Sequence, residues 1–319
     1  DKALEYFDDF YANVYKNNWK DIRTALLKKE SKYLAVVNNF SDTEKIRSNL
    51  ELLGALNLRS VYNVQKENSK REAKYELQAA NYPNLLEAET DSDKTDSDKK
   101  KHLHDGGSIL PVLALDIQLG DIVLDMCAAP GGKALTILQT LMPRLVIAND
   151  VIESRIKRIK NVMNQFVSNI CEKENMFLIM QQDARTINEN GRYNKILVDV
   201  PCTTDRHNLH TDENNIFKQS RVKERLKLPE IQSEILASAL KLVSVGGTVV
   251  YSTCSLSPIQ NDGVVQVALK KAWQENNCVM VVKYVFCIFL IGLKYGHIVI
   301  PTCHNNWGPM YFCKIVKVQ

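Results

Sequence analysis

The sequence predicts an α/β fold, in which a mostly parallel sheet is covered by helices on both faces and follows a helical N-terminal region. After Gly107, apolar runs of strand length alternate with segments of helical pattern. These runs are continuous in Val, Ile and Leu, which is typical of parallel strands buried on both faces. A chain of 319 residues is long enough for one large core with a small appendage.

Five apolar runs are expected to form the parallel strands: 121–128, 145–150, 176–184, 195–201 and 247–255. Helices are expected between them, at 130–142, up to Phe166, and over 228–243, where Gly246 and Gly247 stop the last one. The segments 298–301 and 309–318 predict late strands that form an antiparallel edge. The run 279–293 is shorter than the roughly 20 residues of a membrane span, so a buried strand and no membrane contact are expected.

The chain divides into three regions by composition. Residues 1–60 are expected to be helical, with Ser41 as an N-cap and Glu44 completing a capping box. Residues 61–107 are rich in charge and poor in apolar residues, which predicts a flexible linker or insert. Residues 108–319 carry the α/β domain. The chain begins at Asp1 rather than Met, which indicates a fragment or a processed form.

The overall charge and the cysteines exclude several classes. A net charge of +4 requires local basic patches for any nucleic-acid partner, and 151–160 and 218–227 are the two candidates. Solvated helix faces explain either patch equally well. The eight cysteines contain no C-x-x-C pair and no Cys/His spacing of a zinc site, so no metal is expected. A chain of this size needs no disulfide staples, which favours an intracellular protein.

The stretch CAAPGGK (127–133) follows the first strand and opens a helix, as a ligand-binding turn does. A triphosphate loop would need Gly at 127 and Ser or Thr at 134, where Cys and Ala stand, and no dinucleotide fingerprint G-x-G-x-x-G is present. Asp150, at the end of the second strand, can accept both ribose hydroxyls of a nucleoside. Asp183, after the third strand, can accept from an adenine amino group. A nucleoside without a pyrophosphate fits, and S-adenosylmethionine is the natural candidate.

Two cysteines stand in similar settings, Cys202 in LVDVPCTTDRH and Cys254 in YSTCSLSPIQND. A thiolate that adds to C6 of cytosine makes C5 nucleophilic enough to accept a methyl group. That chemistry needs a thiol, a carboxylate to hold the protonated N3 and amino edge, and a methyl donor. Asp199 supplies the carboxylate. A buried structural thiol explains either cysteine alone, but two such thiols at strand ends beside a cofactor turn favour catalysis.

Together, LDMCAAPGGKA, LVDVPCTTDRH and YSTCSLSPIQND resemble the Sun-type RNA cytosine-5 methyltransferases over 105–319. The resemblance implies a class I S-adenosylmethionine-dependent methyltransferase fold, Rossmann-like, with a mostly parallel seven-stranded sheet. It also implies that Cys254 is the nucleophile and that Cys202 assists product release. Spacing alone does not decide between the two thiols.

Three segments, 31–40, 199–218 and 306–315, resemble the mitochondrial branch of that family, which methylates small-subunit ribosomal RNA. This closer resemblance implies a location in the mitochondrial matrix, a role in ribosome assembly, and a helical repeat partner of the mitochondrial transcription-termination-factor type. The cofactor residues that it implies are Gly131, Gly132, Lys133, Asp150, Arg155, Asp183, Ala184 and Asp199.

The sequence departs from the family at Asp262, where Glu is frequent, at Ala184, where Gly is usual, and over 278–297, which is compressed. Ala184 is expected to be tolerated if its backbone is not left-handed. Two alternative functions stay open at this point. One is an RNA-binding ribosome assembly factor in which methylation is secondary, and the other is a transfer-RNA cytosine-5 methyltransferase.

Overall fold

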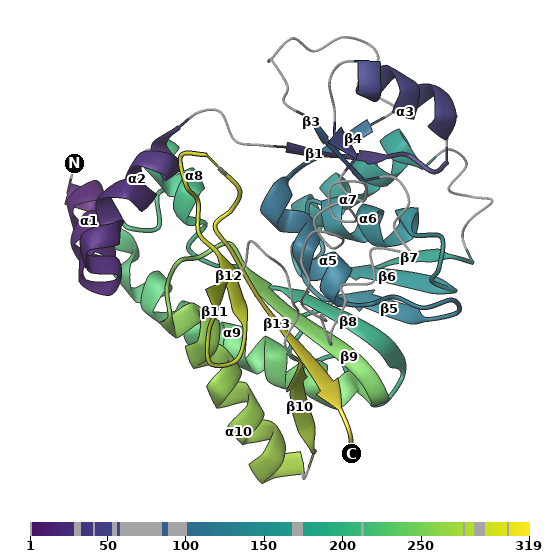
Figure 1. Ribbon diagram of the computed structural model, residues 1–319. Helices are drawn as coiled ribbons and strands as arrows, with labels where there is room; N and C mark the ends of the chain where they lie inside the picture. Colours follow the sequence, from purple (N-terminus) through teal and green to yellow (C-terminus); the bar gives the residue numbers. More distant parts are fainter. Residues whose placement is uncertain are drawn as a thin grey trace, which may run out of the picture.

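The computed structural model describes residues 2–28, 33–40, 42–52, 56–57, 85–88, 101–167, 175–211, 214–276, 278–283, 291–304 and 306–319. Its centre is a nine-stranded sheet in the order β11-β12-β13-β9-β8-β5-β6-β7, with β10 paired to β13 (Figure 1). The strands are β5 (Ile122–Asp125), β6 (Leu145–Asn149), β7 (Phe177–Met180), β8 (Tyr193–Asp199), β9 (Val243–Thr253), β10 (Met280–Lys283), β11 (Ile291–Gly292), β12 (His297–Val299) and β13 (Met310–Lys317).

The five predicted parallel strands are confirmed. β7, β6, β5, β8 and β9 are parallel neighbours, and β13 then runs antiparallel to β9. The sheet has nine strands, two more than the seven that the resemblance implies. All five parallel strands point their carboxyl ends to the same edge of the sheet, which is where ligands bind in such folds.

Two layers of helices cover the sheet, as the continuous apolar runs predict. On one face, Val123 packs with residues of α5 (Leu110–Ala114), α6 (Gly132–Gln139) and α7 (Glu153–Phe166). On the other face, Leu124 packs with residues of α9 (Val222–Leu242) and α10 (Val264–Asn276). Neighbouring residues of one strand therefore enter different cores, and both side-chain sets must be apolar. Five shorter helical segments also lie in the described part of the chain: α8 (Asp205–His210), the 3-10 helices η1 (Lys16–Asn18), η4 (Gly106–Ile109) and η6 (Gln219–Arg221), and the π-helix η7 (Ile259–Gly263).

The N-terminal region is helical only in part. The predicted helices are present as α1 (Lys2–Tyr15), α2 (Trp19–Leu27) and α3 (Thr43–Leu52). Four strands were not expected: β1 (Tyr33–Val37), β2 (Leu56–Asn57), β3 (Leu85–Ala88) and β4 (Lys101–Asp105). They form an antiparallel sheet in the order β2-β3-β1-β4.

β3 and β4 fall inside the predicted linker, whose other residues up to Lys100 lie outside the described part. The three-way division of the chain stays a prediction.

Two local expectations need comment. Ser41 lies outside the described residues; α3 begins at Thr43, where Asp42 accepts the Lys45 N–H at 3.3 Å. The expectation of a buried strand at 279–293 is wrong for β10, whose side chains alternate between half-buried and exposed because it lies at a margin of the sheet. Residues 284–290 lie outside the described part. None of the helices that the structure describes combines the length and apolar character needed to cross a bilayer.

Candidate active site

The two candidate thiols meet at the carboxyl edge of the sheet. Cys202 follows β8 and Cys254 follows β9, two parallel neighbours in which Asp199 is paired with Ser252. The Sγ atoms lie 3.1 Å apart, and both side chains are half-buried. The hydrogen bond with Cys202, together with burial, raises the pKa of Cys254 well above the ordinary thiol value. At rest the thiol therefore holds its proton, and a thiolate has to be generated in the site.

An ion pair lies beside the thiols. Lys133 Nζ is 2.8 Å from Asp199 Oδ2, while Ser252 Oγ donates to Asp199 Oδ1 at 2.7 Å. Burial alone would lower the pKa of Lys133, but the Asp199 carboxylate and the nearby Cys254 thiol raise it above its usual value. Lys133 is therefore a fixed positive charge next to the thiol pair.

The turn before α6 requires glycine at Gly131. Its φ is +114°, and a Cβ at this position would lie 3.3 Å from the Ile159 backbone. Gly132 begins the helix, so the free backbone amides of this helix end face the same edge of the sheet. The glycine-rich turn thus places Lys133 while letting α6 pack closely against α7.

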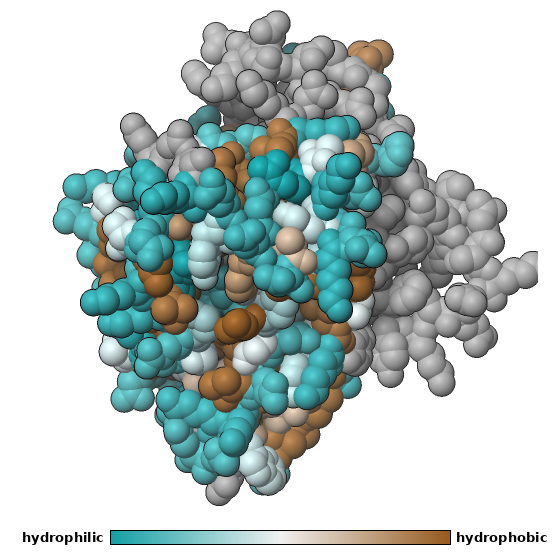
Figure 2. All heavy atoms as spheres, turned by 90° about the vertical axis from the view of Figure 1, so that its left-hand side faces the viewer, coloured by the Kyte–Doolittle hydropathy of each residue, from teal (hydrophilic) through white to brown (hydrophobic). Residues whose placement is uncertain are grey.

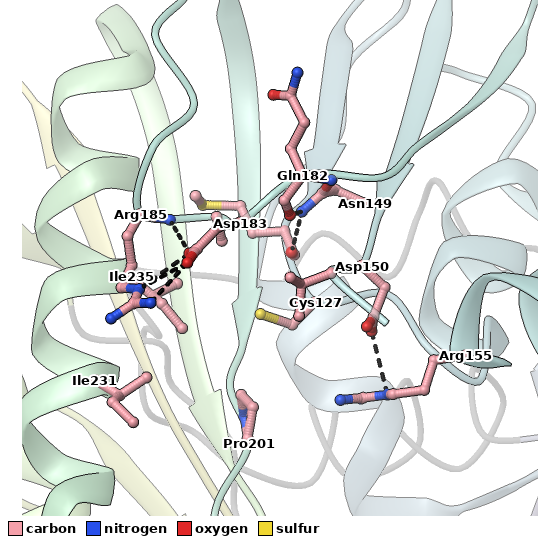
Figure 3. Close-up of a pocket in the computed structure, with 13 residues that line it drawn as sticks. Cys127, Asn149, Asp150, Arg155, Gln182, Asp183, Arg185, Pro201, Ile231 and Ile235 are labelled. Atoms are coloured by element: carbon pink, nitrogen blue, oxygen red, sulfur yellow. Dashed lines mark hydrogen bonds and ion pairs between the residues drawn. The ribbon is translucent and has the colours of Figure 1, made fainter. Parts of the chain in front are cut away.

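Beside this turn is a pocket of about 130 Å³, drawn in Figure 3. Of the predicted cofactor residues, Asp150, Arg155, Asp183 and Ala184 line it. The other four predicted cofactor residues do not line the pocket: Gly131, Gly132, Lys133 and Asp199. Asp199 lies two residues before Pro201, which is a lining residue. The walls are otherwise mostly apolar, from Met126, Val151, Pro201, Ile231 and Ile235.

Asp150 is almost completely buried and is held by its own loop. Its Oδ2 lies 3.3 Å from Arg155 Nε, and its Oδ1 accepts the Ile152 N–H at 3.2 Å. Arg155 also donates to the Ala129 carbonyl at 3.3 Å. Arg155 therefore ties the end of β6 to the turn before α6, at one side of the pocket (Figure 3).

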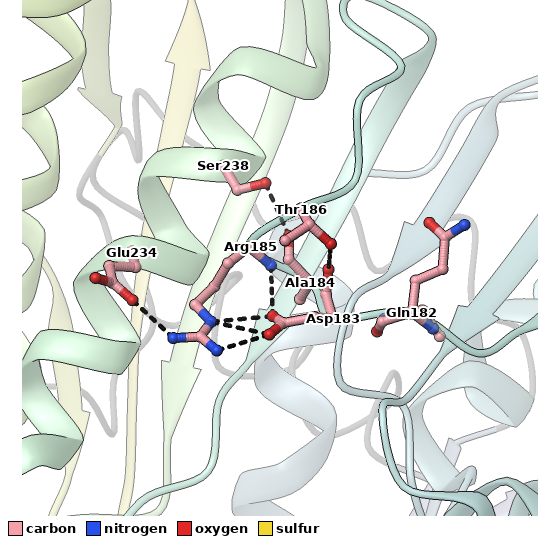
Figure 4. Close-up of polar contacts among 8 residues, drawn as sticks. Gln182, Asp183, Ala184, Arg185, Thr186, Glu234 and Ser238 are labelled. Carbon is pink, nitrogen blue, oxygen red and sulfur yellow. Dashed lines mark hydrogen bonds and ion pairs between the residues drawn. The ribbon is translucent and has the colours of Figure 1, made fainter.

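Asp183 carries an ion pair that the sequence did not reveal. Arg185 reaches Asp183 Oδ2 at 2.6 Å and Glu234 of α9 at 3.0 Å (Figure 4). The hydrogen bonds from Arg185 lower the pKa of Asp183. Ala184 does not have a positive φ, so its side chain is tolerated as expected, and its carbonyl accepts from Ser238 at 2.8 Å.

Asp125 is a site residue that the sequence reasoning missed. It ends β5 and is 1% exposed. Neither carboxyl oxygen makes a hydrogen bond of full geometry with the described chain, although the Cys127 backbone N–H is close enough to lower its pKa. Burial, followed by the repulsion of Asp199, raises its pKa to about 8, against the opposing effect of Lys133. An orphaned buried carboxyl beside the pocket indicates a place for a polar or positively charged ligand atom.

A second missed group is a buried network that joins the two cysteine loops. Asp205 is fully buried and accepts from Thr203 Oγ1 at 2.5 Å, from the Leu256 N–H at 2.6 Å and from Tyr11 OH of α1 at 2.6 Å. Gln260 Nε2 donates to Thr203 Oγ1 at 3.1 Å. Thr203 follows Cys202 and Leu256 follows Cys254 by two residues, so the network fixes one loop against the other.

The remaining family departure also has a structural role. Asp262 accepts from Tyr311 OH at 2.6 Å and from the Lys294 N–H at 2.8 Å. The shorter carboxylate therefore binds β13 and the turn before β12 rather than the thiols. Among the residues that the structure covers, no cluster of three or more His, Cys, Asp and Glu is placed to hold a metal ion.

Comparison with known proteins identifies the family of the chain. The family model described as 16S rRNA methyltransferase RsmB/F matches residues 112–315. The chain is 39% identical over 345 residues to the 5-cytosine rRNA methyltransferase NSUN4 of Mus musculus, covering 99% of this chain and 88% of that one. It is 35% identical over 325 residues to the mitochondrial tRNA (cytosine(34)-C(5))-methyltransferase of Danio rerio, covering 99% and 87%.

Solved structures share the fold. NSun6 from Pyrococcus horikoshii, solved with SFG, has a TM-score of 0.68 at 18% identity, covering 98% of this chain and 97% of that one. A methyltransferase homologue from the same organism has a TM-score of 0.62 at 22% identity, covering 100% and 98%.

The fold and the site define a class I S-adenosylmethionine-dependent methyltransferase. The chain belongs to the RsmB/F family of RNA methyltransferases. The pocket fits the cofactor on two counts: the carboxylates at its rim and the apolar walls for a flat ring. The buried Asp125 carboxyl lies next to Met126 of the pocket wall.

Proposed function

We propose that the protein methylates C5 of a cytosine in the small-subunit ribosomal RNA of mitochondria, through a covalent adduct with Cys254. The observation that carries the proposal is the pair of thiols 3.1 Å apart, with the Lys133–Asp199 ion pair beside them at the same edge of the sheet. An ordinary buried cysteine needs neither a second thiol nor a fixed charge at a ligand-binding edge.

Cys254 is proposed as the nucleophile. Its thiolate adds to C6 of the cytosine, which forms a C6–S bond and makes C5 electron-rich. Its raised pKa makes thiolate formation costly. The Lys133 ammonium group lowers this cost, because it is fixed by Asp199 and interacts with the thiol. Methylation of C5 follows, and loss of the C5 proton then breaks the C6–S bond and frees Cys254.

Cys202 is proposed to assist that release. Because its sulfur lies 3.1 Å from that of Cys254, it would lie close to the C5 and C6 atoms of a cytosine attached to Cys254. In its thiolate form it can therefore take the proton from C5 as the C6–S bond breaks. The C5–C6 double bond re-forms, and the Cys254 sulfur leaves with the electron pair of the broken bond. Asp199, at the end of β8, is proposed to hold the protonated N3 and amino edge of the ring and to keep Lys133 in place.

For the cofactor we propose the predicted residues in two groups. Asp150, Arg155, Asp183 and Ala184 form the pocket, and Gly131, Gly132, Lys133 and Asp199 form the turn and the edge beside it. When bound, the cofactor supplies an electrophilic methyl group on a sulfonium. The orphaned Asp125 carboxyl suits a positive neighbour, because a positive charge favours its ionised form.

The substrate and the location are inferred from relatives. The Mus musculus relative named as an rRNA enzyme is 39% identical, against 35% for the Danio rerio tRNA enzyme. The difference is small, so a transfer RNA is the second candidate substrate. The tRNA relative is named mitochondrial, which supports the mitochondrion as the location, and we place the protein in the matrix. A partner of the mitochondrial transcription-termination-factor type, and a role in ribosome assembly, complete the proposal.

The nucleophile is tested with Cys254→Ser and the matched control Cys303→Ser, an exposed thiol away from the site. Methyl transfer from labelled cofactor to mitochondrial small-subunit rRNA and to mitochondrial tRNA is measured in parallel. We expect Cys254→Ser to abolish transfer and Cys303→Ser to retain it. Full turnover by Cys254→Ser would overturn the assignment, and transfer to tRNA alone would select the second candidate.

The release role is tested with Cys202→Ser. Because the adduct forms but does not resolve, we expect a covalent protein–RNA species on a denaturing gel, and expect it to vanish in the Cys202→Ser, Cys254→Ser double variant. Bisulfite mapping of mitochondrial rRNA with and without the protein then locates the modified cytosine. An assembly defect that the double variant fully rescues would instead favour the role of a non-enzymatic assembly factor.

A further inference from the structure

A second cavity, of about 140 Å³, lies between α1 and the first half of α9 and shares no lining residue with the cofactor pocket. One wall carries Thr203, directly after Cys202, and Ser257, three residues after Cys254. The cavity is therefore lined by the same two loops that carry Cys202 and Cys254. The other wall is aromatic and apolar, formed by Tyr6, Phe10, Tyr11, Phe217, Arg225, Leu226 and Pro229.

Arg225 is held at this wall by three contacts. Its Cζ lies 4.4 Å from the centroid of the Tyr6 ring and 5.3 Å from that of Phe217, and its Nη1 donates to the Ile216 carbonyl at 2.9 Å. A guanidinium group fixed beside aromatic rings adds a positive charge to the aromatic surface, with little further loss of rotamer freedom on binding.

The rim of the cavity exposes apolar side chains that nothing in the described chain covers. Tyr6 is 43% exposed, Leu226 70% and Ile259 60%. Figure 2 shows this side of the molecule, where hydrophobic patches lie among hydrophilic ones. Inside, Ser257 is 4% exposed, and its hydroxyl makes no hydrogen bond with the residues that the structure describes. The cavity thus combines a stacking surface with an unused hydrogen-bonding group.

The charge around the cavity is divided between its two helices. Lys223 and Lys227 are exposed on the first turns of α9, and Arg221 is paired with Glu224 at 2.6 Å. α1, by contrast, exposes Glu5 and Asp9. A polyanion would therefore follow α9 and avoid α1.

We propose that this cavity binds an unpaired nucleobase of the RNA substrate next to the target cytosine, with the neighbouring phosphates along Lys223 and Lys227. Proteins read single-stranded RNA by stacking splayed bases on aromatic rings and guanidinium planes, beside a basic track. The proposal rests on the proposed function, since the base belongs to the same RNA. Ser257 then donates to or accepts from an edge of the bound base.

The test is a double-mutant cycle between protein and RNA. Binding to the full chain is measured by fluorescence anisotropy with a labelled rRNA oligonucleotide, and with a series in which one nucleotide near the target is abasic. Base stacking is worth at least about a fivefold change in Kd. We expect Tyr6→Ala to weaken binding of the intact RNA by that factor, and we expect removal of one base from the RNA to weaken binding to the unchanged chain equally. Combined, they should weaken binding no further than either alone.

The controls separate stacking from folding. Tyr6→Phe keeps the ring and should bind within about twofold of the unchanged chain, while Arg225→Lys keeps the charge but removes the plane and should weaken binding. The proposal is overturned if the losses of RNA affinity are additive at every abasic position. It is also overturned if Tyr6→Ala leaves RNA affinity unchanged, which is the result expected of a protein-docking surface. If the unchanged chain methylates the RNA but Tyr6→Ala shows no coupling to any abasic position, only the proposed base-binding site is refuted. If it methylates no RNA, the proposed function fails.

Discussion

Tyr11 is the most informative residue to change, because it joins the N-terminal helix to both cysteine loops. Its hydroxyl donates to Asp205 Oδ2 at 2.6 Å, across 194 residues of sequence. Asp205 accepts three further hydrogen bonds, from Thr203, Ser255 and the Leu256 N–H. Oδ2 takes part in three of these four hydrogen bonds and Oδ1 in the fourth. Tyr11→Phe removes one of the four donors and keeps the ring in the core.

The expected loss of stability follows from the kind of bond. A hydrogen bond to a charged group contributes about 1.5–3 kcal/mol, so we expect Tyr11→Phe to cost about 2 kcal/mol. An unfolding entropy of about 2.1 cal/mol/K per residue gives about 0.7 kcal/mol/K for a chain of 319 residues, and the melting temperature should fall by about 3 °C. Because the network fixes the loop of Cys202 against that of Cys254, kcat should also fall by roughly tenfold, with KM for RNA unchanged.

Tyr15→Phe is the matched control. Tyr15 lies one helical turn further along α1 and donates to the Leu256 carbonyl at 2.7 Å, a neutral acceptor. Its loss should cost about 1 kcal/mol. Urea unfolding of both variants is measured at pH 5 and pH 8, together with methyl transfer at saturating cofactor.

The pH dependence distinguishes the two variants. Burial raises the pKa of Asp205, and the donors oppose that rise. Removing Tyr11 as a donor raises the pKa further, and a carboxyl with a raised pKa in the folded chain loses stability as pH rises. The deficit of Tyr11→Phe should therefore be larger at pH 8 than at pH 5, while that of Tyr15→Phe should not change. Equal losses for both variants at both pH values would refute the reasoning.

Three further predictions concern the edge of the sheet. Gly131→Ala should weaken cofactor binding by calorimetry and lower the melting temperature, since φ is +114° and the added Cβ meets the α7 backbone at 3.3 Å; unchanged affinity would contradict this. Asp125 has a pKa of about 8 in the folded chain, so the unfolded chain ionises at lower pH than the folded one. From pH 5.5 to 7.5 the free energy of unfolding should fall by about 2 kcal/mol relative to that of Asp125→Asn. A difference between the two proteins that does not change with pH would exclude this raised pKa. Diamide should join Cys202 and Cys254, whose sulfurs need to approach from 3.1 Å to about 2.05 Å, and stop methyl transfer until dithiothreitol is added; activity that survives diamide would argue against the thiol pair.

The part of the fold that could be predicted is the part that local pattern determines. A strand buried on both faces must be apolar at every position, so β5, β6 and β9 stand out in the sequence. The small antiparallel sheet could not be found in this way. β4 has the sequence KHLHD, and it pairs with β1, about seventy residues earlier. Its stability comes from non-local pairing, which leaves no periodic signal in a short polar segment.

The candidate site divides in the same way. The cysteines could be placed because each follows a recognisable strand, and parallel strands bring their ends to one edge. Asp125 and Asp205 could not, because a carboxylate gains importance only when the fold removes it from water, and the sequence does not show burial of a single polar residue. Asp183 was predicted as a strand-end carboxylate and lines the pocket. Its pairing with Arg185 and Glu234, however, depends on how α9 packs.

The N-terminal helix is therefore part of the catalytic edge. A thiol pair at 3.1 Å needs both loops held to a fraction of an ångström, and the sheet fixes only where the loops begin. Beyond the strand ends, the loop positions are set by Asp205, and α1 supplies one donor to Asp205 and a second hydrogen bond, from Tyr15, to the same segment. The packing of Phe7 on Phe217, with ring centroids 4.7 Å apart, holds α1 in place. A chain that retained every recognisable motif but lacked α1 would keep the thiols and lose what sets their separation.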